Sequence, residues 1–244
     1  MNPRSVYSNL EPFCVQVSHP SFDPLMTGFQ PDSSRAAEAS HRYVLDLVRA
    51  ADRERFLGAL FAPEPRRSGL LALLAFDHEL ARTRSVTREP MLARIRLEWW
   101  REAMAEAAGS GKPRAQPIVE ALAETIRRHG LVLESLVELI DAREEEIEGP
   151  LDVMRAGHAL ADLELGVLGV EDAASRQAAH AVGAAWLMGE GPERDQLVGD
   201  ARALRRKVDP AALPILLPAL SLGRPLGPLR RPLAYWWAAR RGRY

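Results

Sequence analysis

The sequence has almost no cysteine and almost no lysine. Cys14 is the single cysteine, so the chain can form neither an internal disulfide framework nor a metal cluster of several thiolates. This scarcity indicates a protein of a reducing compartment. Only two of the 32 basic residues, Lys112 and Lys207, are lysines, a bias that we attribute to genomic composition rather than to function.

The chain also lacks an excess of charge and a long hydrophobic run. Its 32 basic and 33 acidic residues leave a formal net charge of -1, which provides no field for attracting nucleic acid. The longest apolar run, residues 211–222, is shorter than the roughly 20 residues of a spanning helix and contains Pro214 and Pro218. We recognise no secretory signal and therefore expect a cytoplasmic protein.

No stretch alternates between polar and apolar residues over the length of a strand, whereas apolar residues recur at helical spacing along most of the chain. We therefore predict a single all-α domain over residues 39–244, whose first helix begins near Ser40 as a possible N-cap. Residues 1–38, which contain five prolines, are predicted to be a disordered or loosely packed extension. The later helices are expected at about 52–61, 67–84, 89–107, 117–129, 131–148, 151–168, 171–188, 193–207, 210–222 and 228–241.

Two adjacent helices organise the rest of the chain. The helix over 67–84 contains the apolar run 70–76, and the helix over 89–107 contains the neighbouring residues Trp99 and Trp100. Successive helical side chains point about 100 degrees apart, so one tryptophan can enter the core while the other lies at its margin. The residues that we expect to face inward from this second helix are Leu92, Ile95, Trp99 and Ala103.

The order of short motifs along the helices resembles the squalene/phytoene synthase family. The resemblance covers most of residues 41–244 and implies a helical bundle of the isoprenoid-synthase type. Active members of that family join two prenyl diphosphates head to head, and aspartate-rich motifs on two helices hold magnesium ions on the diphosphates. The segments that carry the resemblance are 55–63, 74–76, 94–100, 139–143, 181–185 and 209–217.

Both magnesium motifs of the family are missing from this sequence. The aspartates of the first motif would fall at Ala81, Arg82 and Ser85, none of which offers a carboxylate. The second motif would follow Ala184, where residues 186–195 contain glycines and a proline instead of a helical row of aspartates. The resemblance therefore implies a member with no catalytic residues, no metal ligands and no cofactor.

The segments 76–84 and 95–101 resemble more closely a divergent branch of the family, which includes the mitochondrial complex I assembly factor six and its bacterial relatives. By this resemblance we expect a protein that binds or assembles subunits of respiratory complex I, peripheral to the inner membrane. Two alternatives stay open. One is a magnesium-dependent prenyl transferase of the squalene or phytoene type, and the other is a carrier that binds an isoprenoid or an isoprenyl diphosphate.

Asp77, Arg82 and Arg84 are the candidates for a ligand pocket. Asp77 and Arg84 share the apolar stripe of their helix and could line a polar cavity, while Arg82 places a cation where the family has a metal ligand. The interpretation that we favour for Asp77 and Arg84 is a buried ion pair between neighbouring helices.

Two further groups of charged residues lie on single helices. Asp141, Glu144, Glu145 and Glu148 share one helix face, which we interpret as a solvated acidic face rather than a metal site. Residues 211–244 contain no Asp or Glu, and their mixture of arginine and aromatic residues is typical of a helix on an anionic membrane or against an acidic protein. A docked helix with an arginine fringe is the alternative. The residues predicted to form this surface are Arg230, Arg231, Trp236, Trp237, Arg240 and Arg241.

Overall fold

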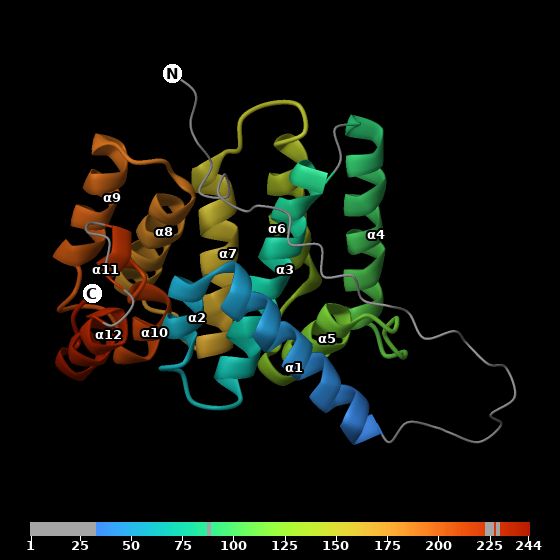
Figure 1. Cartoon of the computed structure of the whole chain (residues 1–244), viewed down its shortest axis with the longest axis horizontal. Coiled ribbons are helices and arrows are strands. Elements are labelled where there is room, and N and C mark those ends of the chain that lie inside the picture. Colours follow the sequence, from blue (N-terminus) through green and yellow to red (C-terminus); the bar gives the residue numbers. More distant parts are fainter. Residues whose placement is uncertain (1–32, 87–88, 223–226, 228–229) are drawn as a thin grey trace, which may run out of the picture.

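The helical pattern of the sequence is realised throughout the described part of the chain (Figure 1). The computed structural model describes residues 33–86, 89–222, 227 and 230–244, and these residues contain no β-strand. The prediction of a single all-α domain is confirmed. The helices are α1 (Ser33–Ala51), α2 (Arg53–Ala59), α3 (Arg66–Val86), α4 (Pro90–Ala108), α5 (Pro117–His129), α6 (Leu133–Glu145), α7 (Val153–Leu168), α8 (Ala173–Leu187), α9 (Pro192–Ala203), the 3-10 turn η1 (Pro210–Ala212), α10 (Leu213–Leu216), α11 (Ala219–Leu222) and α12 (Arg230–Arg241).

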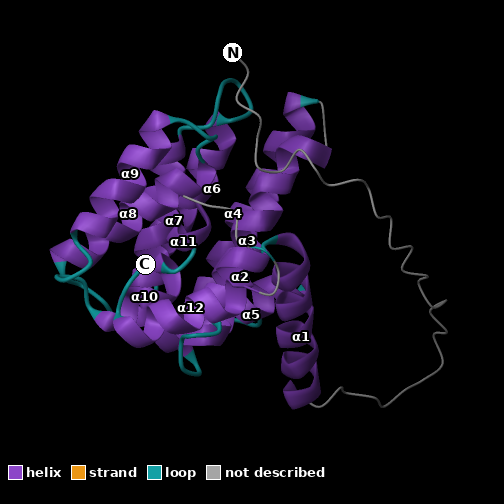
Figure 2. Cartoon of the chain, turned by 60° about the vertical axis from the view of Figure 1, so that its left-hand side comes forward, coloured by secondary structure: helices purple, strands orange, loops and turns teal. Residues whose placement is uncertain are grey.

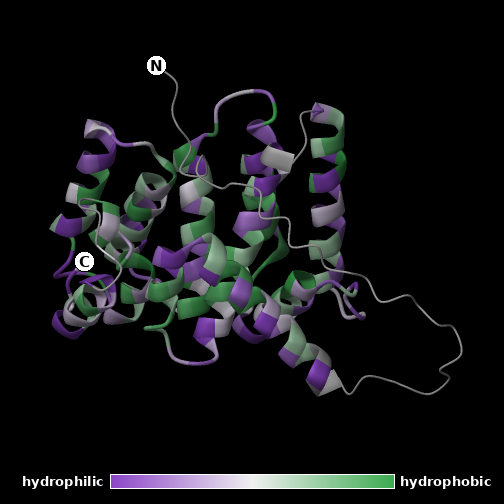
Figure 3. Ribbon diagram, in the orientation of Figure 1, coloured by the Kyte–Doolittle hydropathy of each residue, from purple (hydrophilic) through white to green (hydrophobic). Residues whose placement is uncertain are grey.

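The helix α3 is the centre of the bundle. Its apolar run 70–76 is fully buried, and α3 packs against α1, α2, α4, α5, α6 and α7. In Figure 1, α4 lies at one end of the long axis and α9 at the other, with α3 and α7 between them. Figure 3 shows hydrophobic residues concentrated where the central helices meet.

The helix α5 begins and ends at the residues that the sequence predicts. Pro117 occupies the first turn, where its missing N–H is not needed, and the side chain of Gln116 accepts a hydrogen bond from the backbone nitrogen of Val119 at 2.8 Å. Gly130 ends the helix with a φ of 66°, a left-handed conformation that favours glycine. The expected helix over 117–129 is confirmed.

The helices α7 and α8 lie side by side in both views of the bundle (Figures 1 and 2). A Cβ atom on Gly157 would lie 2.4 Å from the backbone nitrogen of Ala184, and one on Gly183 would lie 2.5 Å from the carbonyl oxygen of Gly157. Because both distances are far below van der Waals contact, the two backbones touch at this point. The glycine residues of the two helices allow this close approach.

The first helix begins before the expected start near Ser40. Ser40 lies inside α1, where its hydroxyl donates a hydrogen bond to the carboxylate of Glu120 on α5 instead of capping a helix end. Residues 33–38, which the sequence assigns to the N-terminal extension, are helical and belong to α1. The rest of that extension, residues 1–32, lies outside the described residues.

The helix α4 turns a different side to the core from the predicted one. Leu92 and Ile95 are 50% and 59% exposed and Trp99 is 36% exposed, whereas Trp100 is only 3% exposed. The prediction that Leu92, Ile95 and Trp99 face the core is therefore wrong. The same prediction for Ala103 is confirmed. The reason is that α4 carries apolar residues on both faces, so the periodicity does not select the buried one.

The expected helix over 210–222 is divided into η1, α10 and α11. Pro218 stands between α10 and α11, where it has no backbone N–H to continue the first helix. None of the described helices combines the length and the hydropathy that would be needed to span a bilayer.

Candidate functional site

A buried charged centre joins α2, α3 and α6. Asp77 on α3 is 1% exposed and accepts hydrogen bonds from Nη2 of Arg143 on α6 at 2.7 Å and from Nη2 of Arg55 on α2 at 3.1 Å. Nε of Arg55 also donates to Oδ2 of Asp52 at 2.5 Å. One interior carboxylate is thus held by two guanidinium groups from two other helices.

The local sequence explains how these side chains reach the interior. The apolar run 70–76 buries the middle of α3, and Asp77 follows it directly at the same depth. Asp52 caps α2 by accepting a hydrogen bond from the backbone nitrogen of Arg55 at 2.9 Å, which fixes the start of the Arg55 side chain. Arg143 follows the buried residues Leu139 and Ile140 at helical spacing on α6 and enters the core with them.

Asp77 is held in its charged form. Burial raises the pKa of this carboxyl group, but the charges of Arg143 and Arg55 and their hydrogen bonds lower it further, and the net direction is down. A carboxylate that is paired and hydrogen-bonded in this way can be tolerated in an interior that would otherwise neutralise it. The centre is therefore an electrostatic link between three helices.

A small cavity lies beside this centre, between α2, α3, α7, α8 and α10. Its volume is about 30 Å³, and apolar side chains together with Arg55, Glu164 and Trp186 line it. The guanidinium of Arg55 lies over the indole of Trp186, 5.6 Å from the ring centroid. Ligand pockets typically measure about 300 Å³ or more, so in this structure the space has the size of a water molecule or two.

Glu164 lines the same cavity from α7 in a very different electrostatic setting. It is buried, and it makes no hydrogen bond or ion pair with any residue in the described part of the chain. Burial raises the pKa of Glu164 to about 8, although the charge of Arg55 lowers it. At neutral pH the group is therefore mainly protonated.

The structure separates the three residues predicted for the ligand pocket. Asp77 lies in the buried centre, next to the cavity, whereas Arg82 is exposed and bonds through Nη1 to Oε1 of Glu79 at 2.6 Å. Nη1 of Arg84 donates to the carbonyl oxygen of Ile147 at 2.9 Å. Neither arginine is among the residues that line the cavity, and the cations that meet Asp77 come from α2 and α6.

Arg55, Arg143 and Glu164 are the site residues that sequence reasoning misses. Each carries a signal in retrospect, because each is a charged residue at a position that helical spacing assigns to an apolar face. Glu164 stands between Leu163 and Leu165 in a long apolar segment. Helical spacing does not predict the partner of each charged residue, because the partner depends on which helices pack together.

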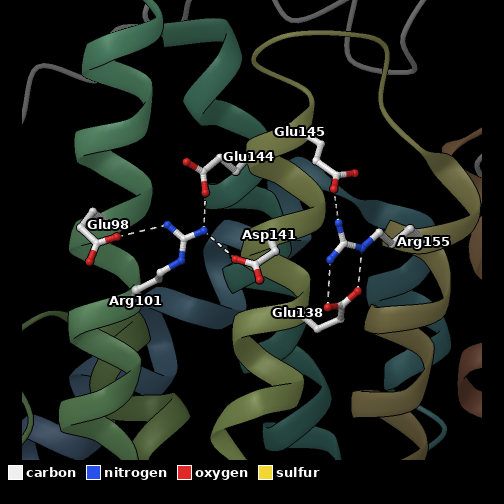
Figure 4. A network of polar contacts seen from close by, with 7 residues as sticks. All are labelled: Glu98, Arg101, Glu138, Asp141, Glu144, Glu145 and Arg155. Atoms are coloured by element: carbon white, nitrogen blue, oxygen red, sulfur yellow. Dashed lines mark hydrogen bonds and ion pairs between the residues drawn. The ribbon is translucent and has the colours of Figure 1, made fainter.

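Carboxylates on α6 are bound by arginines of the neighbouring helices (Figure 4), whereas Glu148 lies beyond the end of α6 at Glu145. Arg101 on α4 donates to Asp141 at 2.5 Å and also to Glu144, and Arg155 on α7 bonds to Glu145 and, at 2.7 and 3.0 Å, to Glu138. Arg94 pairs with Glu148. The acidic face is partly exposed to solvent, with Glu145 and Glu148 at 57% and 73%, and its carboxylates also form ion pairs with other helices. The described residues contain no group of three or more His, Cys, Asp or Glu side chains suited to a metal ion.

The residues predicted for the C-terminal surface lie on α12, and most of them are exposed. Trp236 and Trp237 are 47% and 50% exposed, and Arg240 and Arg241 lie over their rings at 5.6 and 4.8 Å from the centroids. Arg231 differs from the others, because its Nε lies 2.6 Å from Oε1 of Glu54 in an ion pair with α2. Arg231 thus ties the helix to the body of the protein.

A second hollow lies at the molecular surface between α7 and α9. It measures about 450 Å³, opens widely to solvent and is lined by Met154, Met188, Pro192 and Leu197 with two polar residues. None of the residues of the buried charged centre lines this hollow.

The described residues form an all-α bundle around α3, with a buried charged centre beside a small cavity. Residues 48–188, more than half of the chain, match the family model described as squalene/phytoene synthase, and the chain belongs to this family. A solved structure of squalene synthase HpnC from Alicyclobacillus acidocaldarius superposes with a TM-score of 0.58, covering 84% of this chain and 95% of that chain at 17% identity. The expected fold type and family are confirmed.

Two curated relatives point to the divergent branch. The chain is 30% identical over 164 residues to the NADH dehydrogenase (ubiquinone) complex I, assembly factor 6 of Bos taurus, which covers 63% of this chain and 48% of the relative. It is also 30% identical over 160 residues to the protein of the same name from Rattus norvegicus, covering 60% and 46%. The chain therefore spans about half the length of the curated relatives it matches.

Proposed function

We propose that this chain is a non-catalytic member of its family that assists the assembly of a respiratory NADH dehydrogenase complex by binding one or more of its subunits. The similarity to relatives named as assembly factors of that complex supports the role. We place the protein at the cytoplasmic side of the inner membrane, as a peripheral protein, and assign it no cofactor.

The filled interior is the observation that carries the non-catalytic part of this proposal. Arg55 and Trp186 stack within the bundle, and the space left beside them is about 30 Å³. Two prenyl diphosphates need far more room than this, and the charged centre beside the cavity is already neutralised by its own partners. The interior is thus organised for stability of the bundle rather than for turnover of a large apolar substrate.

The positions of the family's magnesium motifs support the same conclusion. Arg82 is an exposed cation bonded to Glu79, where active members would have a carboxylate. The helix α8 ends at Leu187, so the segment that should carry the second motif leaves the helix. Magnesium is expected only if the prenyl transferase alternative holds.

Thermal unfolding with farnesyl or geranylgeranyl diphosphate, with and without magnesium, tests whether the interior accepts a prenyl ligand. A ligand that binds the native state must raise the unfolding midpoint, and we expect no shift and no hydrocarbon product on extraction. A magnesium-dependent shift with product would establish a prenyl transferase. A shift without magnesium or product would establish an isoprenoid carrier.

Deletion of the gene in the host organism tests the assembly role. We expect a loss of assembled NADH dehydrogenase and of its activity, restored by the wild-type chain. The activity of succinate dehydrogenase is the matched control and should not change, because the two complexes share a membrane but not subunits. An unaltered level of assembled NADH dehydrogenase would refute the assembly role.

A further inference from the structure

The inner face of α12 is fixed to the body of the protein by one glutamate. Tyr235 is fully buried, and its hydroxyl donates to Oε2 of Glu54 at 3.2 Å. Ser221 donates to the same oxygen at 2.7 Å, and Arg231 pairs with the other oxygen of Glu54. These contacts to α2 hold α12 in one orientation, with its opposite face turned outward.

The outward face of α12 carries large apolar side chains at helical spacing. Leu233, Trp236 and Trp237 are 62%, 47% and 50% exposed, and together with Arg240 they occupy positions i, i+3, i+4 and i+7 of one face. The two indole rings lie nearly perpendicular to each other, with an interplanar angle of 83°. Their centroids lie 5.2 Å apart, so the two rings form one continuous apolar surface.

The helix α12 and the segment after α9 both carry exposed basic side chains. Arg230, Arg240 and Arg241 are exposed on α12 itself. The hydroxyl of Tyr244 donates to the carbonyl oxygen of Ala201 at 2.9 Å, so the end of the chain lies against the end of α9. Directly after that helix, a second basic segment is exposed, residues 205–207. Residues 211–244 contribute no carboxylate side chain.

We propose that the outward face of α12 docks on a lipid bilayer that carries anionic headgroups, with Leu233, Trp236 and Trp237 in the interfacial layer and the arginines on the headgroups. This proposal rests on the peripheral location in the proposed function. Tryptophan is enriched at membrane interfaces because its ring is apolar and its N–H is polar. A helix with apolar and basic residues on one face and a folded domain behind it lies in the plane of such an interface.

The helix α4 offers a comparison within the same molecule. It also exposes apolar side chains, including Met91 at 64% and Ile95 at 59%, but its outward face continues into Glu98 and Glu102, which are 61% and 62% exposed. An anionic surface would repel these carboxylates. Apolar exposure alone therefore does not define the docking face, and α4 provides a matched control.

Flotation of the full chain with vesicles tests the proposal. We expect binding to vesicles of phosphatidylcholine mixed with phosphatidylglycerol and little binding to vesicles of phosphatidylcholine alone. Arg240→Gln with Arg241→Gln should weaken binding roughly fivefold per arginine, since each contributes about 1 kcal/mol near an anionic surface. Trp236→Ser with Trp237→Ser should weaken it further, whereas Met91→Ser with Ile95→Ser on α4 should leave it unchanged.

Equal binding to both kinds of vesicle, or unchanged binding of the α12 variants, would overturn the proposal. Binding to polyglutamate but not to anionic vesicles would also overturn it, in favour of an acidic protein partner. Because these substitutions are at exposed positions, circular dichroism should show an unaltered fold. If the wild-type chain does not bind anionic vesicles, but its deletion still lowers the level of assembled NADH dehydrogenase, the docking face is rejected and the proposed function stands. If the wild-type chain binds these vesicles and its deletion leaves assembly unaltered, only the proposed function is rejected.

Discussion

Asp77 and Glu164 are both buried carboxyl groups of the same bundle, and Arg55 influences both of them. Asp77 accepts hydrogen bonds from two arginines, and its pKa is lowered. Glu164 has no such partner among the described residues, and its pKa is raised to about 8. Burial alone therefore does not determine the charge state. The difference comes from whether a cation from a neighbouring helix reaches the carboxyl oxygens at hydrogen-bonding distance.

The largest change in the free energy of unfolding is expected when the ion pairs of Asp77 are removed. Asp77→Ala leaves Arg143 buried without its carboxylate partner on α3, and removing one member of a buried pair costs about 3–5 kcal/mol. Urea denaturation should show this loss as a lower free energy of unfolding. The double variant Asp77→Leu with Arg143→Met should recover most of it, because the buried charge of Arg143 is removed together with that of Asp77. Of the remaining partners, Arg55 keeps its ion pair with Asp52, and Glu146 is partly exposed. A loss below about 1 kcal/mol in the single variant would contradict this account.

Replacement of Glu164 should have a smaller effect of opposite sign, an increase in the free energy of unfolding. Below about pH 4.5 the carboxyl group of Glu164 is protonated in both the folded and the unfolded state, so its ionisation does not lower the free energy of unfolding. As the pH rises toward 8, the unfolded state releases its proton while the folded state keeps it, so the free energy of unfolding falls. Above about pH 8 the full cost of the buried charge is present.

Glu164→Gln removes this titration while keeping the shape of the side chain. The variant should be more stable than the wild-type chain by an amount on the order of a few kcal/mol at about pH 9, and nearly equal to it at about pH 4. Thermal unfolding at several pH values measures the difference. If the two chains respond to pH in parallel, Glu164 is not the group that titrates.

The sequence predicts the parts of this molecule that local chemistry determines. The end of α5 at Gly130 follows from a left-handed backbone, and the close packing of α7 and α8 follows from their small residues. The first is a property of one segment and is visible before the fold is known. The second also requires that α7 and α8 be neighbours, so the sequence indicates only that α8 can pack closely.

The pairings within the candidate site depend on packing between distant segments. Arg143 meets Asp77 across 66 positions in the chain, and no local pattern selects that partner over Arg84. The same reasoning explains the exposed Trp99 and the buried Trp100, since α4 has apolar residues on both faces and only its place at the edge of the bundle decides between them. Composition likewise predicts charged groups on α6 but not the arginines that bind them.

The smallest effect is expected for the ion pairs in Figure 4, which use the same chemistry as the centre at Asp77 but lie near the surface. Arg101 bonds to carboxylates whose side chains are 33–61% exposed, so water and salt screen the attraction. Arg101→Met should lower the free energy of unfolding by about 1 kcal/mol at low ionic strength, and the difference should shrink in about 1 M salt. Asp77→Ala, measured beside it, should keep its cost in salt because its partners are buried. If Arg101→Met lowered the free energy of unfolding by several kcal/mol and salt did not change this loss, the α4–α6 ion pairs would behave as buried interactions and not as surface ion pairs.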